Sequence, residues 1–136
     1  MLFASVAFAA EEKSCKKNCE TPAPVVFFDI AGPDVEKLTD FYSRTFAWKI
    51  DLNNNIDKAT TGGLGGSLLK KDIPDKIIYL GVPDVTAALQ KVAAAGGTIL
   101  APRLEVKGVV ILGLFKDPAG NTMGLVETVK GKIKIP

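Results

Sequence analysis

The side chains of this sequence that could perform chemistry are carboxylates, hydroxyls, basic groups and two cysteines, because its 136 residues include no histidine. Histidine is the commonest transition-metal ligand and the usual general base near neutral pH. Its absence excludes histidine-containing zinc and iron sites and every Ser-His or Cys-His nucleophile pair. A metal would have to be held by carboxylates, carbonyls or thiols. The sequence therefore predicts neither a metal nor another cofactor.

The two cysteines are Cys15 and Cys19, near the N-terminus. Two thiols alone make an incomplete zinc or copper site. In an exported protein an even pair favours a disulfide, because the periplasm is oxidising. We predict that disulfide. Free thiols, or a metal or redox role for thiols whose pKa is lowered by neighbouring lysines, are the alternatives.

The segment before the cysteines resembles a secretory signal. Residues 2–10 are almost wholly small or apolar, and Ala7-Phe8-Ala9 has the small-x-small pattern of a cleavage site. This run is too short to span a membrane as a helix. No Lys or Arg precedes it, so an ordinary N-terminal tail of a cytoplasmic protein is the alternative. We predict export to the periplasm, with residues 1–24 as a signal-like segment and linker.

The composition indicates one globular domain. Hydrophobic residues make up 47% of the chain and charged residues 24%, with a net charge of +2, which is ordinary for a soluble domain of this length. No run of like charges suggests a nucleic-acid partner, and no segment is long enough to span a membrane. Lys130, Lys132 and Lys134 indicate a short basic tail at residues 131–136, with the domain at residues 25–130.

Two stretches of the domain share one pattern. An apolar strand at residues 25–30 leads through Asp34 into an amphipathic helix, and a second strand at residues 77–82 leads through Asp84 into another. Pro33-Asp34-Val35 and Pro83-Asp84-Val85 are identical and lie 50 residues apart. Further strands are predicted at residues 62–69, 98–100, 109–115 and 122–129. The pattern predicts an internal repeat of one βαβββ unit, with modules at about residues 25–70 and 76–129.

Four short motifs within these modules are similar to those of a known family. They are residues 35–48, which include Asp40-Phe41-Tyr42 and Phe46-Ala47-Trp48; Val82-Pro83-Asp84-Val85; Ala95-Gly96-Gly97; and Asp117-Pro118-Ala119-Gly120-Asn121 leading into Gly124-Leu125-Val126-Glu127. Over residues 24–129 the sequence resembles the vicinal oxygen chelate superfamily of glyoxalases, bleomycin-resistance proteins and extradiol dioxygenases. The resemblance implies an α+β fold in which two tandem βαβββ modules pair into a curved mixed sheet around a cleft. It also implies a homodimer, since many members dimerise.

The resemblance further implies metal ligands at defined positions, and this sequence departs from them. The family's first-strand histidine falls on Phe27, its counterpart in the second module on Ile77, and the last-strand glutamate on Gly124. A further ligand would lie in residues 62–69, where only Ser67 has a ligating side chain. The family's chemistry depends on a metal that polarises substrate oxygens. The departure therefore argues against that chemistry and against enzymatic activity of the usual kind.

Strand alternation predicts which side chains face the cleft. Phe27 and Asp29 share one face of the first strand. Thr122 and Val126 share a face with Gly124, whereas Glu127 points to the opposite face and is expected to cap or pair at a strand end. Asp29 is expected either to accept a hydrogen bond from a ligand or to pair with a Lys or Arg.

The cleft is expected to be apolar and aromatic. Phe27, Ile77 and Tyr79 line it by alternation, and Trp48 and Arg103 are expected at its rim. Either an open pocket or a cleft filled by these side chains is consistent with the pattern. The predicted ligand-binding residues are Phe27, Asp29, Trp48, Ile77, Tyr79, Arg103, Thr122 and Gly124.

Three functions follow as hypotheses. The first is a metal-independent protein that binds an apolar or aromatic small molecule. The second is a metal-dependent lyase or isomerase with an unconventional site. The third is a non-catalytic dimeric module in which the cleft is filled.

Overall fold

The computed structural model describes residues 21–136. The predicted signal segment and the predicted Cys15–Cys19 disulfide lie outside these described residues. Within them, no helix is long and apolar enough to cross a membrane.

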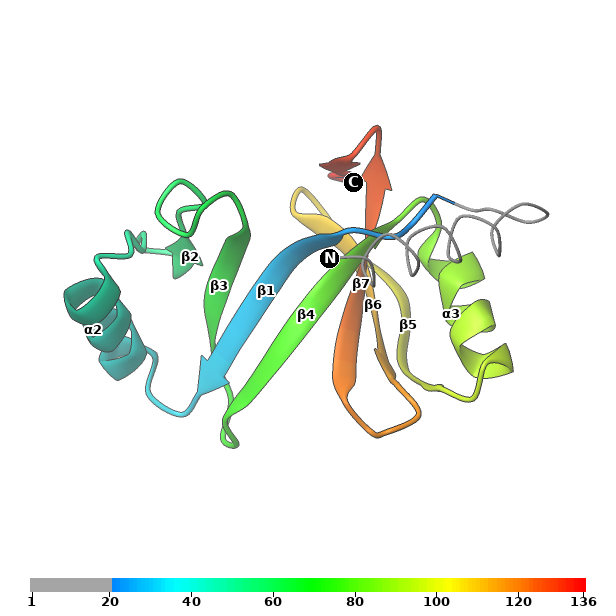
Figure 1. Cartoon of the computed structure of the whole chain (residues 1–136), viewed down its shortest axis with the longest axis horizontal. Helices are drawn as coiled ribbons and strands as arrows, with labels where there is room; N and C mark the ends of the chain where they lie inside the picture. The colour runs from blue at the N-terminus through cyan, green and yellow to red at the C-terminus, as the bar shows by residue number, and fades with distance from the viewer. Residues whose placement is uncertain (1–20) are drawn as a thin grey trace, which may run out of the picture.

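One curved mixed sheet forms the body of the molecule. Its strands follow one another in the order β2-β3-β1-β4-β7-β6-β5, and β8 pairs with β7. The helices α2 and α3 lie at opposite ends of the molecule with the sheet between them (Figure 1). The elements are β1 (Val25–Gly32), α2 (Val35–Phe46), β2 (Asn55–Ile56), β3 (Gly65–Lys70), β4 (Asp75–Val82), α3 (Val85–Ala94), β5 (Thr98–Val106), β6 (Val110–Lys116), β7 (Thr122–Val129) and β8 (Lys132–Ile133).

The two halves of the chain join at the centre of the sheet. Strand β1 pairs in parallel with β3, and β4 pairs in parallel with β7. The strands β1 and β4 are antiparallel neighbours, so a single chain supplies both halves. The first half has fewer strands than the predicted βαβββ unit. Before β2, the chain forms only an isolated bridge, in which Ile50 pairs with Ile56 of β2.

Both helices begin at the predicted aspartates. The Asp34 side chain accepts a hydrogen bond from the backbone N–H of Lys37 at 3.1 Å, and Asp84 accepts one from Ala87 at 3.0 Å. Each aspartate thus satisfies one N–H of the first helical turn that has no partner within the helix. The helices differ in burial, since α3 buries Val85 and Leu89 whereas α2 has no fully buried residue.

The sheet has two unlike faces. The face that carries the helices, here called the outer face, holds a core in which Val85 and Leu89 of α3 pack with Phe115 and Leu125. The opposite face, here called the inner face, holds a separate cluster of Ile77, Tyr79 and Val126, against which Phe27, Val110 and Leu114 pack. Adjacent residues of one strand supply different faces, as the two-residue period of a strand requires.

Two predictions about the C-terminal half need correction. Residues 131–136 are mostly exposed but do not form a free tail, because Lys132–Ile133 pairs with β7 and the Lys134 N–H donates to the Glu127 carbonyl at 2.8 Å. The strand predicted at residues 98–100 runs on to Val106. It passes Pro102 where the register with β6 shifts. Proline is tolerated there, because β5 is an edge strand with an irregularity at that point.

Candidate functional site

A cavity of about 430 Å³ lies on the inner face, and its lining is predominantly apolar. Within the described part of the chain, Asp29 is the only charged residue that lines it. The polar lining residues besides Asp29 are Asn55, Ser67 and Tyr79. The apolar ones are Phe27, Leu69, Val106, Val109, Val110, Leu112, Val126 and Ile133.

Two hydroxyl groups hold the Asp29 carboxylate. The Tyr79 Oη donates to Asp29 Oδ2 at 2.6 Å, and the Ser67 Oγ donates to Asp29 Oδ1 at 2.5 Å. The sheet register explains both contacts, because Ser67 of β3 lies directly opposite Asp29, and Tyr79 of β4 lies two residues beyond its other neighbour, Ile77. Asp29 is only 5% exposed.

The structure therefore corrects one expectation for Asp29. Its partners are hydroxyls, and no ion pair joins it to a Lys or Arg in the described part of the chain. The physical reason is the register, which brings the neutral side chains of Ser67 and Tyr79 next to Asp29 on the inner face.

Tyr79 is buried in the cluster on the inner face. A Cβ added at Gly124 would lie 2.2 Å from the Tyr79 ring, so the ring needs a glycine beneath it. Phe27 meets the Tyr79 ring edge-on, with centroids 6.0 Å apart. Burial and the hydrogen bond to Asp29 raise the pKa of Tyr79 well above its ordinary value, so the hydroxyl remains a donor.

The two alternatives for the cleft are therefore both realised in part. Aromatic rings fill the space around Phe27, Tyr79 and Gly124. An open cavity remains beside them, bounded by β3, β6 and β8. Ile77 is buried in the inner-face cluster but does not line this cavity.

Trp48 does not lie at the rim. Its ring stacks on Tyr42 of α2 with centroids 5.0 Å apart, and it meets Phe28 edge-on at 6.0 Å. Ala47, with a φ of 57°, ends α2 in the left-handed conformation just before Trp48. The chain thereby turns back along the helix and places the indole on the outer face.

Arg103 is also wrongly predicted at the rim, because it pairs with Glu127. Its Nε donates to Glu127 Oε2 at 2.6 Å and its Nη2 to Oε1 at 3.0 Å. The same Oε2 accepts the backbone N–H of Val85, the first residue of α3, at 3.1 Å. These contacts, chiefly the one with Arg103, lower the pKa of Glu127. The prediction that Glu127 would cap or pair is confirmed.

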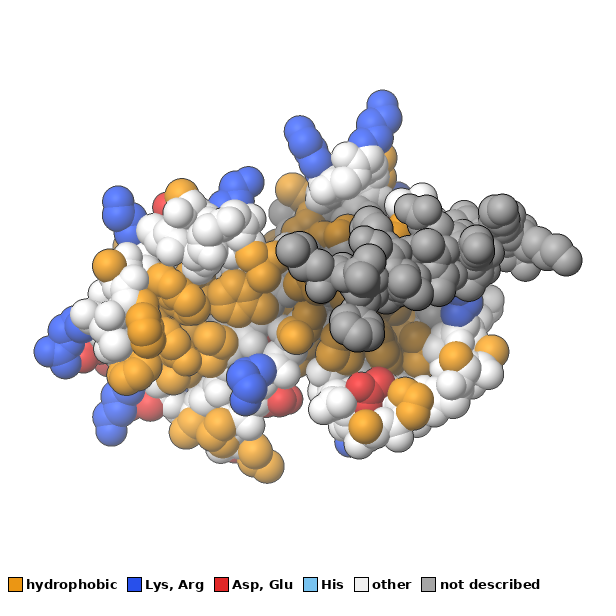
Figure 2. Space-filling view, in the orientation of Figure 1, with side chains coloured by type: hydrophobic (Ala, Val, Ile, Leu, Met, Phe, Trp, Pro, Cys, Tyr) orange, Lys and Arg blue, Asp and Glu red, His pale blue; other side chains and the backbone are white. Residues whose placement is uncertain are grey.

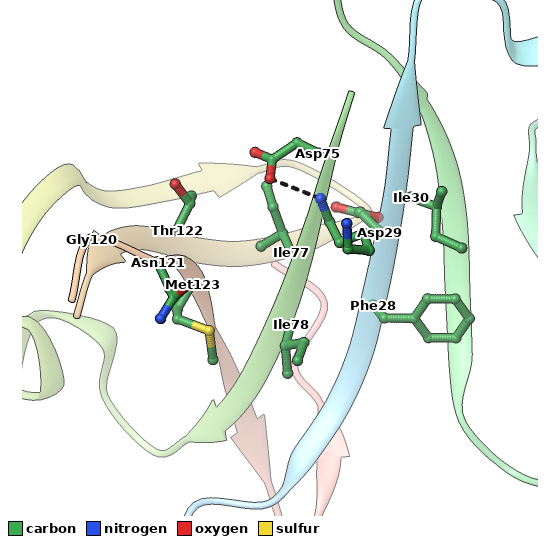
Figure 3. Close-up of a pocket in the computed structure, with 11 residues that line it drawn as sticks. Phe28, Asp29, Ile30, Asp75, Ile77, Ile78, Gly120, Asn121, Thr122 and Met123 are labelled. Carbon is green, nitrogen blue, oxygen red and sulfur yellow. Dashed lines mark hydrogen bonds between the residues drawn. The ribbon is translucent and has the colours of Figure 1, made fainter. Parts of the chain in front are cut away.

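A second, larger hollow of about 680 Å³ lies where β1 ends, β4 begins and β6 turns into β7. Thr122 and Ile77 line this hollow (Figure 3). Figure 3 shows Phe28 and Ile30 on one side of β1 and Asp29 on the other, so the hollow spans both faces of the sheet. We assign the candidate site to the smaller cavity, because its lining includes both hydroxyl partners of Asp29.

Several lining residues were missed by sequence reasoning. Ser67 was considered only as a weak metal ligand, and Asn55, Leu112 and Ile133 were not considered for the site. The one usable signal was alternation within the strand that contains Ser67. Alternation fixes a face within a strand but not the register between strands, so it could not pair Ser67 with Asp29.

Comparison with known proteins places this fold. No family model matches the sequence. The curated relatives that it matches are the anthracycline biosynthesis proteins DnrV of Streptomyces peucetius and DauV of Streptomyces sp. strain C5. Each is 24% identical over 123 residues, which cover 73% of this chain and 45% of the relative. The chain thus spans less than half the length of these relatives.

Solved structures share the fold at low sequence identity. A hypothetical protein from Bacillus halodurans C-125 has a TM-score of 0.62 at 13% identity, covering 84% of this chain and 100% of that one. Methylmalonyl-CoA epimerase from Mycobacterium tuberculosis has a TM-score of 0.60 at 11% identity, covering 82% and 94%. The Streptomyces coelicolor epimerase in complex with 2-nitronate-propionyl-CoA has 0.57 at 15%, covering 80% and 99%.

These likenesses show the fold. The chain shares with these structures the α+β glyoxalase-like fold that its motifs predicted. At these identities the likeness to the epimerases extends to the fold and not to the reaction.

The donor set at the superfamily's metal positions does not suit a metal. Phe27, Ile77 and Gly124 offer no ligand atom, and the Ser67 hydroxyl is engaged by Asp29. Within residues 21–136, no three His, Cys, Asp or Glu side chains gather closely enough to hold an ion.

Proposed function

We propose that this protein binds a small molecule in the inner-face cavity and that binding requires no metal. The observation that carries the proposal is a buried carboxylate, Asp29, held by two hydroxyls at the wall of an apolar cavity. Small-molecule sites are typically apolar concavities with a few well-placed polar groups. A volume of about 430 Å³ lies within the usual range for such sites.

The names of the curated relatives guide the choice of ligands. Both are described as anthracycline biosynthesis proteins, so compounds with fused aromatic rings are suitable first probes. The aromatic rings of Phe27 and Tyr79 favour the same choice, because aromatic groups pack well edge-to-face.

Isothermal titration with 2-naphthylethanol, with and without EDTA, tests this proposal. We expect micromolar binding that EDTA does not change. Leu112→Trp, which fills the cavity, should abolish binding, whereas Ile73→Trp, in an exposed loop outside the lining, should not. Binding that disappears with EDTA and returns with Mn²⁺ would favour the metal-dependent lyase or isomerase instead. Binding that survives Leu112→Trp, in protein shown to be folded by its melting curve, would refute this cavity as the site.

We also propose that the protein is a homodimer. The outer face of the first half exposes Phe41 and Phe46 of α2, which are 53% and 58% exposed, and Ile78 of β4 is 44% exposed. Figure 2 shows hydrophobic side chains gathered over the half of the molecule that contains α2 and β1. Contiguous exposed apolar surface commonly marks a protein interface.

Light scattering during size-exclusion chromatography tests the dimer. Phe46→Asp should yield a monomer, whereas Leu52→Asp, in a fully exposed turn, should leave the dimer intact. A wild-type protein that elutes as a monomer at tens of micromolar would refute the proposal.

Two further proposals rest on the sequence. Residues 2–10 direct export to the periplasm, and Cys15 and Cys19 form a disulfide there. Mass spectrometry of protein from cells that can export it should report a cleaved N-terminus and a mass lower by two hydrogens. An intact Met1 terminus with free thiols would contradict both.

We propose, finally, that the chain arose by duplication of one module. The parallel pairing of β1 with β3 and of β4 with β7 supports this proposal, as does the helix that follows the first strand of each half.

A further inference from the structure

We propose that the ligand of the inner-face cavity is a hydrophobic amine whose protonated nitrogen lies against Asp29. This inference rests on the proposed small-molecule function and names the class of ligand. It follows from the charge, the hydrogen-bonding capacity and the lining of the cavity.

Asp29 is 5% exposed and, among residues 21–136, is the only charged residue that lines the cavity. Its partners, Ser67 and Tyr79, are neutral donors. A buried carboxylate is costly unless a cation or several strong donors compensate it. A cation brought by the ligand would supply that missing compensation.

The hydrogen-bonding capacity of the Asp29 carboxylate also matters. An ionised carboxylate has about four acceptor positions, and the two hydroxyls use one on each oxygen. Acceptor capacity therefore remains on both Oδ1 and Oδ2. A protonated amine carries only donors, so it matches that capacity without an unused acceptor of its own.

Lysines adjoin three lining residues in the sequence. Lys70 follows Leu69, Lys107 follows Val106, and Lys132 and Lys134 flank Ile133, but none of the four lines the cavity. Alternation turns the two lysines that flank Ile133 away from the cavity. In agreement, the Lys134 Nζ lies 3.8 Å from Glu127 Oε1, and Glu127 belongs to the Arg103 pair on the outer face. No lysine or arginine of residues 21–136 lines the cavity.

The walls beyond Asp29 and its two hydroxyl partners are mainly apolar side chains from β1, β3, β5, β6, β7 and β8 and from the turn between β5 and β6, with Asn55 of β2 as a further polar group. Val109 of that turn is largely exposed, so apolar surface continues outward from the cavity. The nitrogen would therefore be one end of a molecule that is otherwise apolar.

Three probes with the same aromatic body test the inference. They are 2-naphthylethylamine, 2-naphthylethanol and 2-naphthylacetic acid, titrated at pH 7 into the full-length protein. Both the amine and the alcohol can donate a hydrogen bond to the Asp29 carboxylate, but only the amine brings a cation to the buried charge, so we expect the amine to bind about tenfold or more tightly than the alcohol. The acid should bind more weakly than the alcohol, because its carboxylate would approach Asp29 with the same charge.

A pair of matched variants locates the preference. Asp29→Asn should reduce the ratio of amine to alcohol affinity to about one. Asp40→Asn makes the same chemical change in the exposed Asp40–Arg44 pair of α2 and should leave the ratio as in the wild type. If Asp29→Asn does not fold, the comparison of the three probes on the wild-type protein still decides.

The outcomes separate this inference from the proposed function. If the three probes bind equally well, or if the acid binds best, the amine inference is overturned while small-molecule binding stands. If none of the probes binds, both are overturned. A preference for the amine that persists in Asp29→Asn overturns the assignment to Asp29.

Discussion

Asp29 and Glu127 are both buried carboxylates, yet they lie in opposite environments on the two faces of one sheet. Glu127 is 3% exposed and accepts hydrogen bonds from the Arg103 guanidinium and from the first N–H of α3. Asp29 is 5% exposed and has two neutral hydroxyls as partners beside a cavity. A cation of the chain compensates Glu127, whereas no lysine or arginine of residues 21–136 forms an ion pair with Asp29.

This difference shows how burial alone fails to distinguish a structural carboxylate from a binding one. A buried charge with a full set of partners contributes to the architecture, here by joining β5, β7 and α3. A buried charge with partial compensation and open space beside it is available to a ligand. The partners decide the role, and each carboxylate can be tested by neutralising it.

The largest effect is expected for Glu127→Gln. The substitution leaves the Arg103 guanidinium without its closest counter-charge. We expect the free energy of unfolding to fall by about 2 to 3 kcal/mol, because breaking a buried pair costs about 3 to 5 kcal/mol and Arg103 retains some contact with water. Urea denaturation at pH 7 measures the change.

The control is Glu105→Gln, since Glu105 contacts the same guanidinium at 3.2 Å but is exposed. Its substitution should cost less than about 0.5 kcal/mol. Equal losses for the two variants would mean that the buried pair has no special structural role.

The next effect is expected for Gly124→Ala. The new Cβ would lie 2.2 Å from the Tyr79 ring, so the ring must move and its bond to Asp29 must lengthen or break. Overpacking of this kind typically costs about 1 to 3 kcal/mol. Gly65→Ala is the control, because its Cβ would meet Phe27 at an ordinary 3.6 Å. If the two alanine variants unfold at the same urea concentration, that result would contradict the close contact between the Tyr79 ring and Gly124.

The features that sequence reasoning predicted correctly are those fixed within a single element. Alternation placed Phe27 and Asp29 on one face and Glu127 on the opposite face, and the Pro-Asp-Val pattern located both helix starts. These features depend on local periodicity and capping, which can be read from neighbouring residues.

The features that it missed depend on contacts between distant segments. The partners of Asp29 lie 38 and 50 residues away, and the register that brings them together has no local signal. Long side chains such as Arg103 reach several places, so their partners are decided by the fold. The C-terminal hairpin did have a local signal in Gly131, because glycine readily adopts the positive φ that this residue has in the turn. The charges of the lysines instead suggested a tail.

Acid should remove the contribution of the Glu127 carboxylate to stability. Arg103 holds the pKa of Glu127 below its ordinary value of 4.5, so this group stabilises the fold above that pH. The contribution should be lost as the pH falls through the lowered pKa. Urea unfolding of the wild type and Glu127→Gln between pH 7 and pH 3 should therefore show two stabilities that converge in acid. A constant difference across this range would contradict the role assigned to the charge of Glu127.

The smallest effect on stability is expected for Asp29→Asn, and it tests the comparison most directly. The amide is nearly isosteric, and the hydroxyls of Ser67 and Tyr79 can reorient to accept as well as donate. No buried cation is left behind, so the free energy of unfolding should change by less than about 1 kcal/mol. The measurement is urea denaturation at pH 7 beside Glu127→Gln. If Asp29→Asn lowers the free energy of unfolding as much as Glu127→Gln does, Asp29 is a structural carboxylate like Glu127. A small loss, together with a loss of the amine preference, would separate the two carboxylates into one that holds the fold and one that faces a ligand.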